Sequence, residues 1–205
     1  MKLLSFDEAV TSLWRGDVVA VPTDTVYGVA ARLFDPSAVT RLFEVKSRPR
    51  NVALPVLLAS AIDVQSLEVE WSTKAQALAD NFWPGALTIV VKAPASSAAL
   101  VGASATLGLR VPRHEALANV IVACGPLAVT SANEHGGVPS MSAEDVRAVE
   151  WGAPVGGVMD GGVCNGAVSS VVELTSRGWR LVRSGALSAR DIAKVIGPES
   201  SVDDQ

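Results

Sequence analysis

The chain lacks several features that would narrow its function at once. It has two histidines and two cysteines among 205 residues, and their spacing does not match a metal site. Cys124 and Cys164 lie far apart, so we expect reduced thiols in the core rather than a disulfide. The motifs G-x-x-x-x-G-K-[ST], G-x-G-x-x-G and H-E-x-x-H are also missing. Their absence excludes the usual P-loop, dinucleotide-binding and zinc-protease signatures.

Long apolar runs and an excess of positive charge are missing as well. No run reaches the roughly 18 residues of a membrane span, and the N-terminus turns acidic at Asp7, too early for a signal peptide. We therefore expect a cytoplasmic protein without membrane contact. The net charge is −4, but three acids follow Gly197, which leaves a body of about −1. A near-neutral body predicts weak tRNA binding at most, although it permits a local basic cleft.

Apolar residues, by contrast, are abundant. They make up 49% of the chain, and the mean hydropathy is +0.33, so there is ample material for a core. A length of 205 residues suits one domain, and the sequence shows neither a repeat nor a linker. We predict a single domain over residues 1–197 and a disordered tail over 198–205.

Helix and strand signals alternate along the first half, which predicts one α/β domain around a twisted sheet. Capping residues and apolar periodicity predict helices over 5–16, 35–45, 72–82 and 114–124, with two more that begin at 142 and 188. Short β-branched runs predict strands over 18–21, 54–58, 87–91, 106–111 and 127–130, and a hairpin over 171–182. The segment 93–105 is rich in Ala, Ser and Gly and is predicted to be a loop.

The most distinctive polar segment is 46–50. Lys46, Arg48 and Arg50 alternate along it, and Pro49 disfavours a helical conformation for the residue before it. In an extended segment, the three cations would share one face within about 14 Å. Such an array suits a nucleoside triphosphate, because guanidinium groups pair bidentately with phosphate oxygens. The alternative is a solvated basic cap that complements a helix dipole.

Polar side chains also stand where several predicted strands end. The segment 22–28 follows the first strand and holds hydroxyls, a carboxylate and the only tyrosine, and 130–133 follows a later strand. Arg110 and Arg183 each end a strand just before a proline or glycine turn. Each cluster alone could be a simple turn. Because ligands gather beyond the carboxyl ends of strands in open sheets, their repetition favours a polyanion site.

Together these segments resemble the YrdC/Sua5 family. Residues 21–28 resemble its opening motif P-T-[DE]-T-x-Y-G, and Lys46-Ser47-Arg48-Pro49 resembles K-x-R-P. Further matches are 83–88 to W-P-G-P-L-T, 110–112 to R-x-P, 130–133 to S-x-N, 169–173 to S-T-V-V-D and 181–185 to R-x-G. The matches keep one order from about residue 6 to residue 193.

The resemblance implies a fold and an activity. The fold would be a single YrdC-like α/β domain whose twisted sheet, mostly parallel or mixed, is flanked by helices and holds an open cleft. The activity would be that of a threonylcarbamoyl-AMP synthase. L-threonine and bicarbonate form N-carboxy-threonine, whose carboxylate attacks the α-phosphate of ATP, with Mg²⁺ assisting. Pyrophosphate leaves, and a separate transferase complex moves the threonylcarbamoyl group to a tRNA adenosine.

The family pattern also implies residue roles. Attack at an α-phosphate needs positioning and positive charge rather than a protein nucleophile, and Lys46 and Arg48 would be the catalytic cations. ATP would contact Lys46, Arg48, Arg50, Thr106, Ser131, Asn133 and Arg183. L-threonine would contact Thr23, Tyr27, Arg110 and Ser169, with Arg110 on its carboxylate. For Tyr27, packing against the first strand is an equal alternative, and no side chain is implied as a metal ligand.

The chain departs from the family pattern at a few positions. Leu57 replaces the histidine that usually ends the run N-P-L-x-V-H, and Val168 stands where a proline usually precedes Ser169. These changes concern amino-acid specificity more than nucleotide binding. A paralogue that acts on another amine is therefore one alternative. An RNA-binding module without turnover is a second, and the near-neutral body counts against it as the main role.

Overall fold

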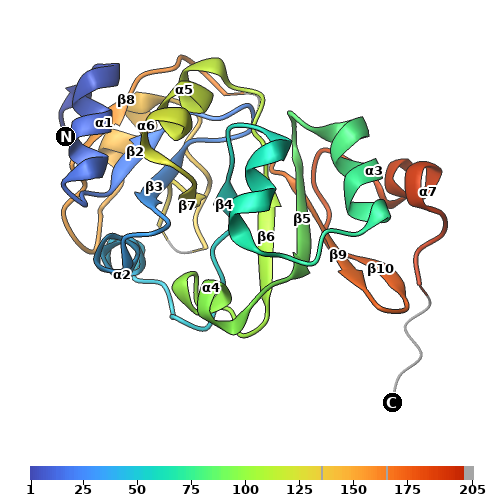
Figure 1. The fold of residues 1–205 in the computed structure, drawn as a ribbon. Helices are drawn as coiled ribbons and strands as arrows, with labels where there is room; N and C mark the ends of the chain where they lie inside the picture. Colours follow the sequence, from blue (N-terminus) through green and yellow to red (C-terminus); the bar gives the residue numbers. More distant parts are fainter. Residues whose placement is uncertain (135, 165, 201–205) are drawn as a thin grey trace.

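The computed structural model describes residues 1–134, 136–164 and 166–200; His135, which the sequence places in a solvated loop, lies outside them. Its strands are β1 (Leu3–Leu4), β2 (Val19–Val21), β3 (Gly28–Arg32), β4 (Val56–Leu57), β5 (Leu87–Lys92), β6 (Thr106–Arg110), β7 (Leu127–Ser131), β8 (Gly157–Met159), β9 (Ser170–Thr175) and β10 (Gly178–Arg183). They form one sheet in the order β1-β8-β2-β3-β7-β4-β6-β5-β9-β10, drawn in Figure 1.

Helices flank the sheet along its length. They are α1 (Phe6–Trp14), α2 (Pro36–Val45), α3 (Thr73–Phe82), α4 (Ala95–Leu100), α5 (Glu115–Cys124), α6 (Ala143–Ala148), α7 (Ala189–Ile196) and the 3₁₀ helix η1 (Ala61–Leu67). Helices α1 and α5 pack together at one end of the molecule, and α3 and α7 pack together at the other (Figure 1). No helix in the described ranges is both long and apolar enough to span a bilayer.

The sheet is mixed. Four pairings are parallel, namely β1 with β8, β8 with β2, β4 with β6 and β5 with β9. The other five are antiparallel, so the mixed form of the prediction is confirmed and the mostly parallel form is not. Hairpin connections contribute to the number of antiparallel pairs, because neighbouring strands joined by a short loop, such as β9 and β10, must pair antiparallel.

Apolar residues form two clusters that lie against the sheet. Alternate residues of one strand enter different clusters, as the two-residue repeat of a strand requires. Val18 and Ala20 belong to the larger cluster, whereas Val19 and Val21 belong to the smaller one. This strand is therefore buried on both sides, which explains why it is a continuous apolar run in the sequence.

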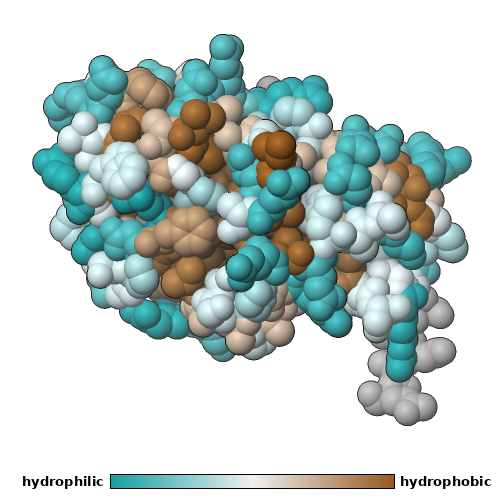
Figure 2. Space-filling view, viewed as in Figure 1, coloured by the Kyte–Doolittle hydropathy of each residue, from teal (hydrophilic) through white to brown (hydrophobic). Residues whose placement is uncertain are grey.

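Figure 2 shows that apolar side chains reach this face of the molecule in separate patches between hydrophilic ones. The larger exposed apolar side chains include Trp14 and Phe34, each a little more than half exposed. The Trp14 ring is covered on one side by the Arg32 guanidinium, whose central carbon lies 3.4 Å from the ring centroid. Such a cation–π contact stabilises an exposed aromatic ring without burying it.

The predicted helices are confirmed, including the caps at Ser5, Asp35, Ser72, His114 and Ser188. The predicted loop over 93–105 is wrong in part, because α4 forms inside it. Alanine has the strongest helix propensity, and Pro94 precedes the first turn without an N–H to lose. Strands β1, β3 and β8 and the helix η1 were not predicted.

The end of the described chain packs against the sheet. The sequence predicts disorder after Gly197, but Ser200 Oγ accepts a hydrogen bond from the Trp179 N–H at 3.0 Å. Glu199 accepts another from the Leu181 N–H at 2.6 Å. These contacts cover the outer edge of β10, which would otherwise present unpaired backbone groups. Residues 201–205 lie outside the described residues.

Candidate active site

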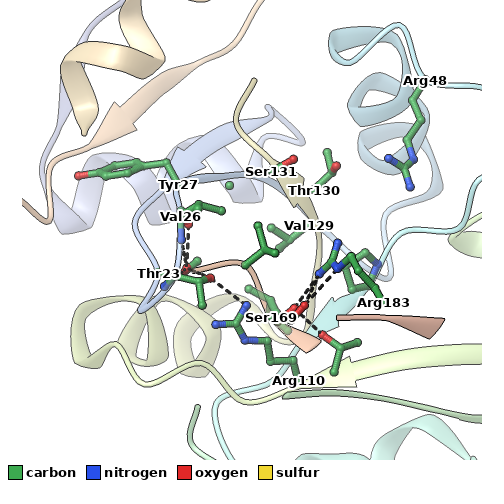
Figure 3. A pocket seen from close by; sticks show the side chains of 16 residues that line it. Thr23, Val26, Tyr27, Arg48, Arg110, Val129, Thr130, Ser131, Ser169 and Arg183 are labelled. Atoms are coloured by element: carbon green, nitrogen blue, oxygen red, sulfur yellow. Dashed lines mark hydrogen bonds between the residues drawn. The ribbon is translucent and has the colours of Figure 1, made fainter. Parts of the chain in front are cut away.

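A cavity of about 160 Å³ is lined by residues at the ends of several strands (Figure 3). Leu57, Arg110 and Ser131 come from the carboxyl ends of β4, β6 and β7. Gly28 begins β3, and Ser169 immediately precedes β9. Gly28 and Ser131 are paired at one end of β3 and β7. Because β4 runs antiparallel to β7, Leu57, Arg110 and Ser169 lie toward the opposite edge of the sheet, and the cavity spans the sheet between the two groups. The expected gathering of polar side chains from strand ends at one cavity is confirmed, but they do not share one edge of the sheet.

Most of the residues singled out from the sequence line this cavity or contact its lining. The lining includes Thr23, Tyr27, Arg48, Arg110, Ser131, Ser169 and Arg183. Asn133 lies directly behind it, because the Ser131 hydroxyl donates to Asn133 Oδ1 at 2.7 Å. Lys46 joins the same group through Asn133. The structure thus brings nine of the predicted residues together.

Two predicted ATP ligands are not brought to the cavity. Thr106 begins β6, and Arg110 ends it, so the two are separated by about 13 Å along the strand. The Arg50 guanidinium instead lies 5.9 Å from the ring centroid of Phe43. Neither residue lines the cavity.

The segment 46–50 is not extended, so the predicted three-cation face is wrong. Lys46 caps α2 with helical dihedral angles, and Ser47 has a φ of 47°, in the left-handed region. This turn points the three side chains in different directions. The Arg48 side chain reaches the cavity, and Lys46 is buried with 4% exposure. The conformation follows from the helix end, which the pattern of charges alone does not reveal.

Lys46 is held by one residue. Its Nζ donates to the backbone oxygen of Asn133 and, at 2.8 Å, to Asn133 Oδ1. Burial lowers the pKa of Lys46 to about 8, and the charge of Arg48 is the second cause. A lysine with a pKa this close to neutrality changes its charge state over an accessible pH range.

Arg48 and Arg183 point into the cavity from different sides (Figure 3). Arg48 is anchored by the Val52 and Ala53 carbonyls at 2.9 and 3.0 Å. Arg183 is anchored by Ser169, whose backbone oxygen accepts at 2.9 and 3.1 Å and whose hydroxyl accepts at 2.9 Å. Burial lowers the pKa of both guanidinium groups, and the charge of Arg183 lowers the pKa of Arg48 further. Two arginines that repel each other favour an anion between them.

Arg110 differs from the other cations because it has a carboxylate partner. Its Nη2 lies 2.6 Å from Asp24 Oδ1, and both side chains are nearly buried. Its Nε donates to the Gly85 carbonyl at 3.0 Å, and its Nη1 donates to Thr25 Oγ1 at 3.1 Å. Burial lowers the pKa of Arg110, and the Asp24 charge opposes this effect. Within the described residues, none of the other three cations forms an ion pair.

The Thr23 hydroxyl is fully engaged within its own turn. It accepts hydrogen bonds from the N–H groups of Thr25 and Val26 at 3.0 and 3.2 Å, and it donates to the Val26 carbonyl at 2.7 Å. The Thr25 hydroxyl lies 2.9 Å away. A hydroxyl has one donor and two acceptor positions, so Thr23 has none left for a ligand in this structure. Its observed role is to shape the turn that presents Thr25 to Arg110.

Tyr27 also serves a structural purpose. Its side chain is buried and points away from the centre of the cavity (Figure 3). The hydroxyl donates to the Gly162 carbonyl at 2.9 Å and accepts from the Gly161 N–H at 3.0 Å. Tyr27 therefore fixes the loop after β8, a contact that neither sequence alternative predicted, and it also lines the cavity.

One wall of the cavity is apolar. It is formed by Val26, Pro55, Leu57, Val129 and Val168. Gly28 completes this wall because a side chain there would collide with it: a Cβ atom would lie 2.6 Å from Val129 Cγ1. Leu57 and Val168, the two departures from the family pattern, both belong to this wall.

Sequence reasoning missed three contributors to the site. Asp24 and Thr25 lie inside the first motif, yet only the structure shows their contacts with Arg110. Thr88 ends the 83–88 motif and places its hydroxyl 3.1 Å from Ser169 Oγ. Membership of a recognised motif is the signal that could have identified all three.

The residues do not form a magnesium cage. Within the described part of the chain, no three His, Cys, Asp or Glu side chains are grouped as metal ligands. Asp24, the carboxylate beside the cavity cations, is already paired with Arg110. Magnesium is usually held by one or two carboxylates together with substrate phosphates. These residues do not fit a resident ion.

Comparison with known proteins identifies the family of this chain. The family model Sua5/YciO/YrdC, described as "Telomere recombination", matches residues 11–185. The chain belongs to the Sua5/YciO/YrdC family. A protein of Mycobacterium tuberculosis, provisionally named threonylcarbamoyl-AMP synthase, is 37% identical over 195 residues, which are 94% of this chain and 89% of that protein.

Longer relatives share the same domain. The threonylcarbamoyl-AMP synthase of Pyrococcus abyssi is 38% identical over 186 residues, which are 89% of this chain and 54% of that protein, so this chain spans about half its length. The crystal structure of P. abyssi Sua5 complexed with L-threonine superimposes with a TM-score of 0.84 at 32% identity. The match covers 100% of this chain and 64% of that one. The α/β YrdC-like fold is therefore shared across this chain.

Proposed function

We propose that this chain is an L-threonylcarbamoyladenylate synthase, which makes threonylcarbamoyl-AMP and pyrophosphate from L-threonine, bicarbonate and ATP. The observation that carries the proposal is the group of Arg48, Arg110 and Arg183 around one cavity of a family relative. Three guanidinium groups at one cavity, of Arg110, which is buried, Arg48, which is half-buried, and Arg183, which is exposed, suit a ligand with several negative charges. The P. abyssi relative crystallised with L-threonine supports the amino-acid half of the proposal.

Hydrogen-bond donors that have no partner among the described residues support the same conclusion. A guanidinium carries five N–H donors. Counted over the described residues, Arg48 uses two donors and Arg110 uses three. Arg183 uses only its Nε and Nη2 groups, so its Nη1 group is unspent. The remaining donors are available to phosphate and carboxylate oxygens.

The chemistry needs no protein nucleophile. The amine of threonine attacks the carbon of bicarbonate, and loss of water gives N-carboxy-threonine. Its new carboxylate oxygen forms a bond to the α-phosphorus of ATP while the bond to pyrophosphate breaks. Negative charge grows on the leaving pyrophosphate, and fixed cations lower the energy of that state. Holding both substrates in one cavity also removes much of the entropic cost of their encounter.

We assign the substrates to two regions of the site. Lys46, Arg48 and Arg183 would hold the phosphates, and Ser131 and Asn133, which the structure links to Lys46, would contact the nucleotide. Arg110 and Ser169 would hold the amino acid. Magnesium would enter with the triphosphate, because the protein offers no cage for it. The product would pass to a transferase complex that modifies a tRNA adenosine.

A second candidate follows from the apolar wall. Leu57 and Val168 line the cavity where the family pattern has histidine and proline, so the amino-acid pocket of this chain differs from that pattern. A paralogue acting on a different amine would retain the phosphate-binding cations and change this wall. The same adenylate chemistry would then run with another amino acid.

The deciding experiment is product formation by purified protein with ATP, L-threonine and bicarbonate. Pyrophosphate release and the acyl-adenylate are followed by mass spectrometry, with threonine omitted in one sample. Lys46→Ala removes a cation from the phosphate region, and Lys74→Ala removes an exposed one from α3 as the matched control. We expect threonine-dependent product that Lys46→Ala reduces strongly and Lys74→Ala does not. Product only with another amino acid would replace threonine by that substrate, and no product with any would refute the activity.

A further inference from the structure

The ion pair between Asp24 and Arg110 is not explained by the reaction described above. The proposed chemistry uses cations to hold anions, and a carboxylate beside them weakens that effect. Asp24 nevertheless lies against Arg110, with 14% of its side chain exposed against 8% for the arginine. Its contact is short, 2.6 Å from Oδ1 to Nη2.

The surroundings of Arg110 fix its orientation from three sides. Asp24 and Thr25 bind it from the turn before β3, and the Gly85 carbonyl binds it from the loop before β5. The planar fork of an arginine cannot rotate while all three contacts are present. Two N–H donors remain unspent, one on each terminal nitrogen, counted over the described residues. Asp24 is the only one of the three partners that itself carries a charge.

We propose that Asp24 is a positioning residue for Arg110 and that its charge also limits the affinity of the site for polyanions. The first effect aims the two remaining N–H donors at a carboxylate. The second effect reduces the net positive charge at the Arg110 end of the cavity. The identification of this carboxylate as the one of L-threonine rests on the proposed function.

The two effects act differently on the two substrates. A polyphosphate responds to the total charge of the site, so removing the Asp24 charge strengthens its binding. An amino acid is a zwitterion with no net charge, and its binding depends mainly on the aim of the guanidinium. Loss of Asp24 therefore weakens amino-acid binding while it strengthens polyphosphate binding. A purely structural ion pair would change both in the same direction, because misfolding weakens all binding.

Two substitutions separate charge from contact. Asp24→Asn removes the charge and keeps an oxygen that can accept from Arg110, whereas Asp24→Ala removes both. Asp24→Glu keeps the charge and tests rescue. Asp7→Asn, which removes one acid from the first turn of α1, is the control for net charge. Calorimetry measures the affinities for L-threonine and for inorganic pyrophosphate separately, and thermal unfolding checks that each variant folds.

We expect Asp24→Ala to weaken threonine binding by about ten-fold, the loss expected for a charge-assisted contact, and Asp24→Asn to weaken it less. Both variants should bind pyrophosphate about two- to ten-fold more tightly, with a steeper dependence on salt. Asp24→Glu should restore part of the threonine affinity. Unchanged pyrophosphate affinity in both variants, or weaker binding of both ligands, would overturn the inference.

This test separates the inference from the proposed function. Failure of the wild-type protein to form threonylcarbamoyl-AMP would refute the function. The pyrophosphate measurement would still decide the charge effect of Asp24, since it needs neither threonine nor turnover. Wild-type activity together with unchanged threonine affinity in Asp24→Ala would refute the positioning role and leave the function intact.

Discussion

ATP binding near pH 8.5 should draw most of one proton onto Lys46. In the free protein, burial lowers the pKa of this lysine to about 8, with the nearby Arg48 charge as the second cause. Its Nζ already donates twice to Asn133, so a protonated lysine has one N–H left for a phosphate oxygen. A bound phosphate would favour the charged form and return the pKa toward its usual value.

The size of the uptake follows from these values. With a pKa of about 8, Lys46 is about one-quarter protonated at pH 8.5. One negative charge at about 4 Å with an effective dielectric constant of about 20 contributes about 4 kcal/mol, or about 3 pKa units. Binding then takes up about 0.75 proton at pH 8.5 and about 0.1 at pH 7. The affinity for ATP falls as the pH rises above 8, because the lysine must first be recharged.

The same pKa shift has a consequence for stability. The pKa of Lys46 falls from its ordinary value of 10.5, which applies to the unfolded chain, to about 8 in the folded protein. Between these two values the unfolded chain binds more protons than the folded one. The free energy of unfolding therefore rises with pH across this window, and the cost of burying the charge is greatest below pH 8.

Calorimetry in buffers with different ionisation enthalpies measures the uptake directly. The slope of the binding enthalpy against the buffer enthalpy gives the number of protons, at pH 8.5 and again at pH 7. Lys46→Arg stays charged throughout, so it should bind ATP with no proton from this site. Lys74→Met on the exposed face of α3 should behave as the wild type.

One result would refute this reasoning. If the wild-type protein binds ATP at pH 8.5 but takes up less than about 0.2 proton on binding, no phosphate charge reaches Lys46. The lysine would then serve only to hold the loop at Asn133. An uptake that persists in Lys46→Arg would place the titrating group elsewhere.

Three further outcomes follow from the geometry. Arg110→Ala should raise the KM for threonine more than the KM for ATP in steady-state kinetics, and equal increases would contradict its assignment. Gly28→Ala places a Cβ atom 2.6 Å from Val129 Cγ1, so denaturant unfolding should show a loss of about 1–3 kcal/mol and calorimetry should show weaker ligand binding. Deletion of residues 198–205 removes the Ser200 contact from the edge of β10, so thermal unfolding should occur at a lower temperature and gel filtration should show more self-association.

The sequence predicted the helices better than the strands, for a physical reason. A helix is marked at both ends, and the caps at Asp35 and Ser72 accept the hydrogen bonds that the sequence predicts. Strands β1 and β8 have two and three residues, too few for any periodicity to appear. Their pairing is decided by contacts between distant segments, such as Val158 against Ala20.

The positions of the site residues were predictable from motifs, but their conformations were not. The left-handed φ of Ser47 turns the chain between Lys46 and Arg48, and a serine gives no sign of it, because glycine is the usual residue there. The same turn sends Arg50 away from the cavity. Thr106 was assigned by analogy, and its place at the far end of β6 follows from the strand length alone.

In this site, a group that can bind a ligand differs from a structural group because it keeps hydrogen-bond donors that have no partner within the described part of the protein. Thr23 and Arg110 both come from motifs of the family, and the sequence gives them similar standing. The structure shows the Thr23 hydroxyl saturated by its own turn, whereas Arg110 keeps two N–H donors after binding three partners. Substitution of Thr23 should therefore disturb the turn and, through Thr25, the aim of Arg110. Arg110 can bind the substrate directly through its two remaining donors. Comparing substitutions of Thr23 and Arg110 therefore tests the assignment of the amino-acid site.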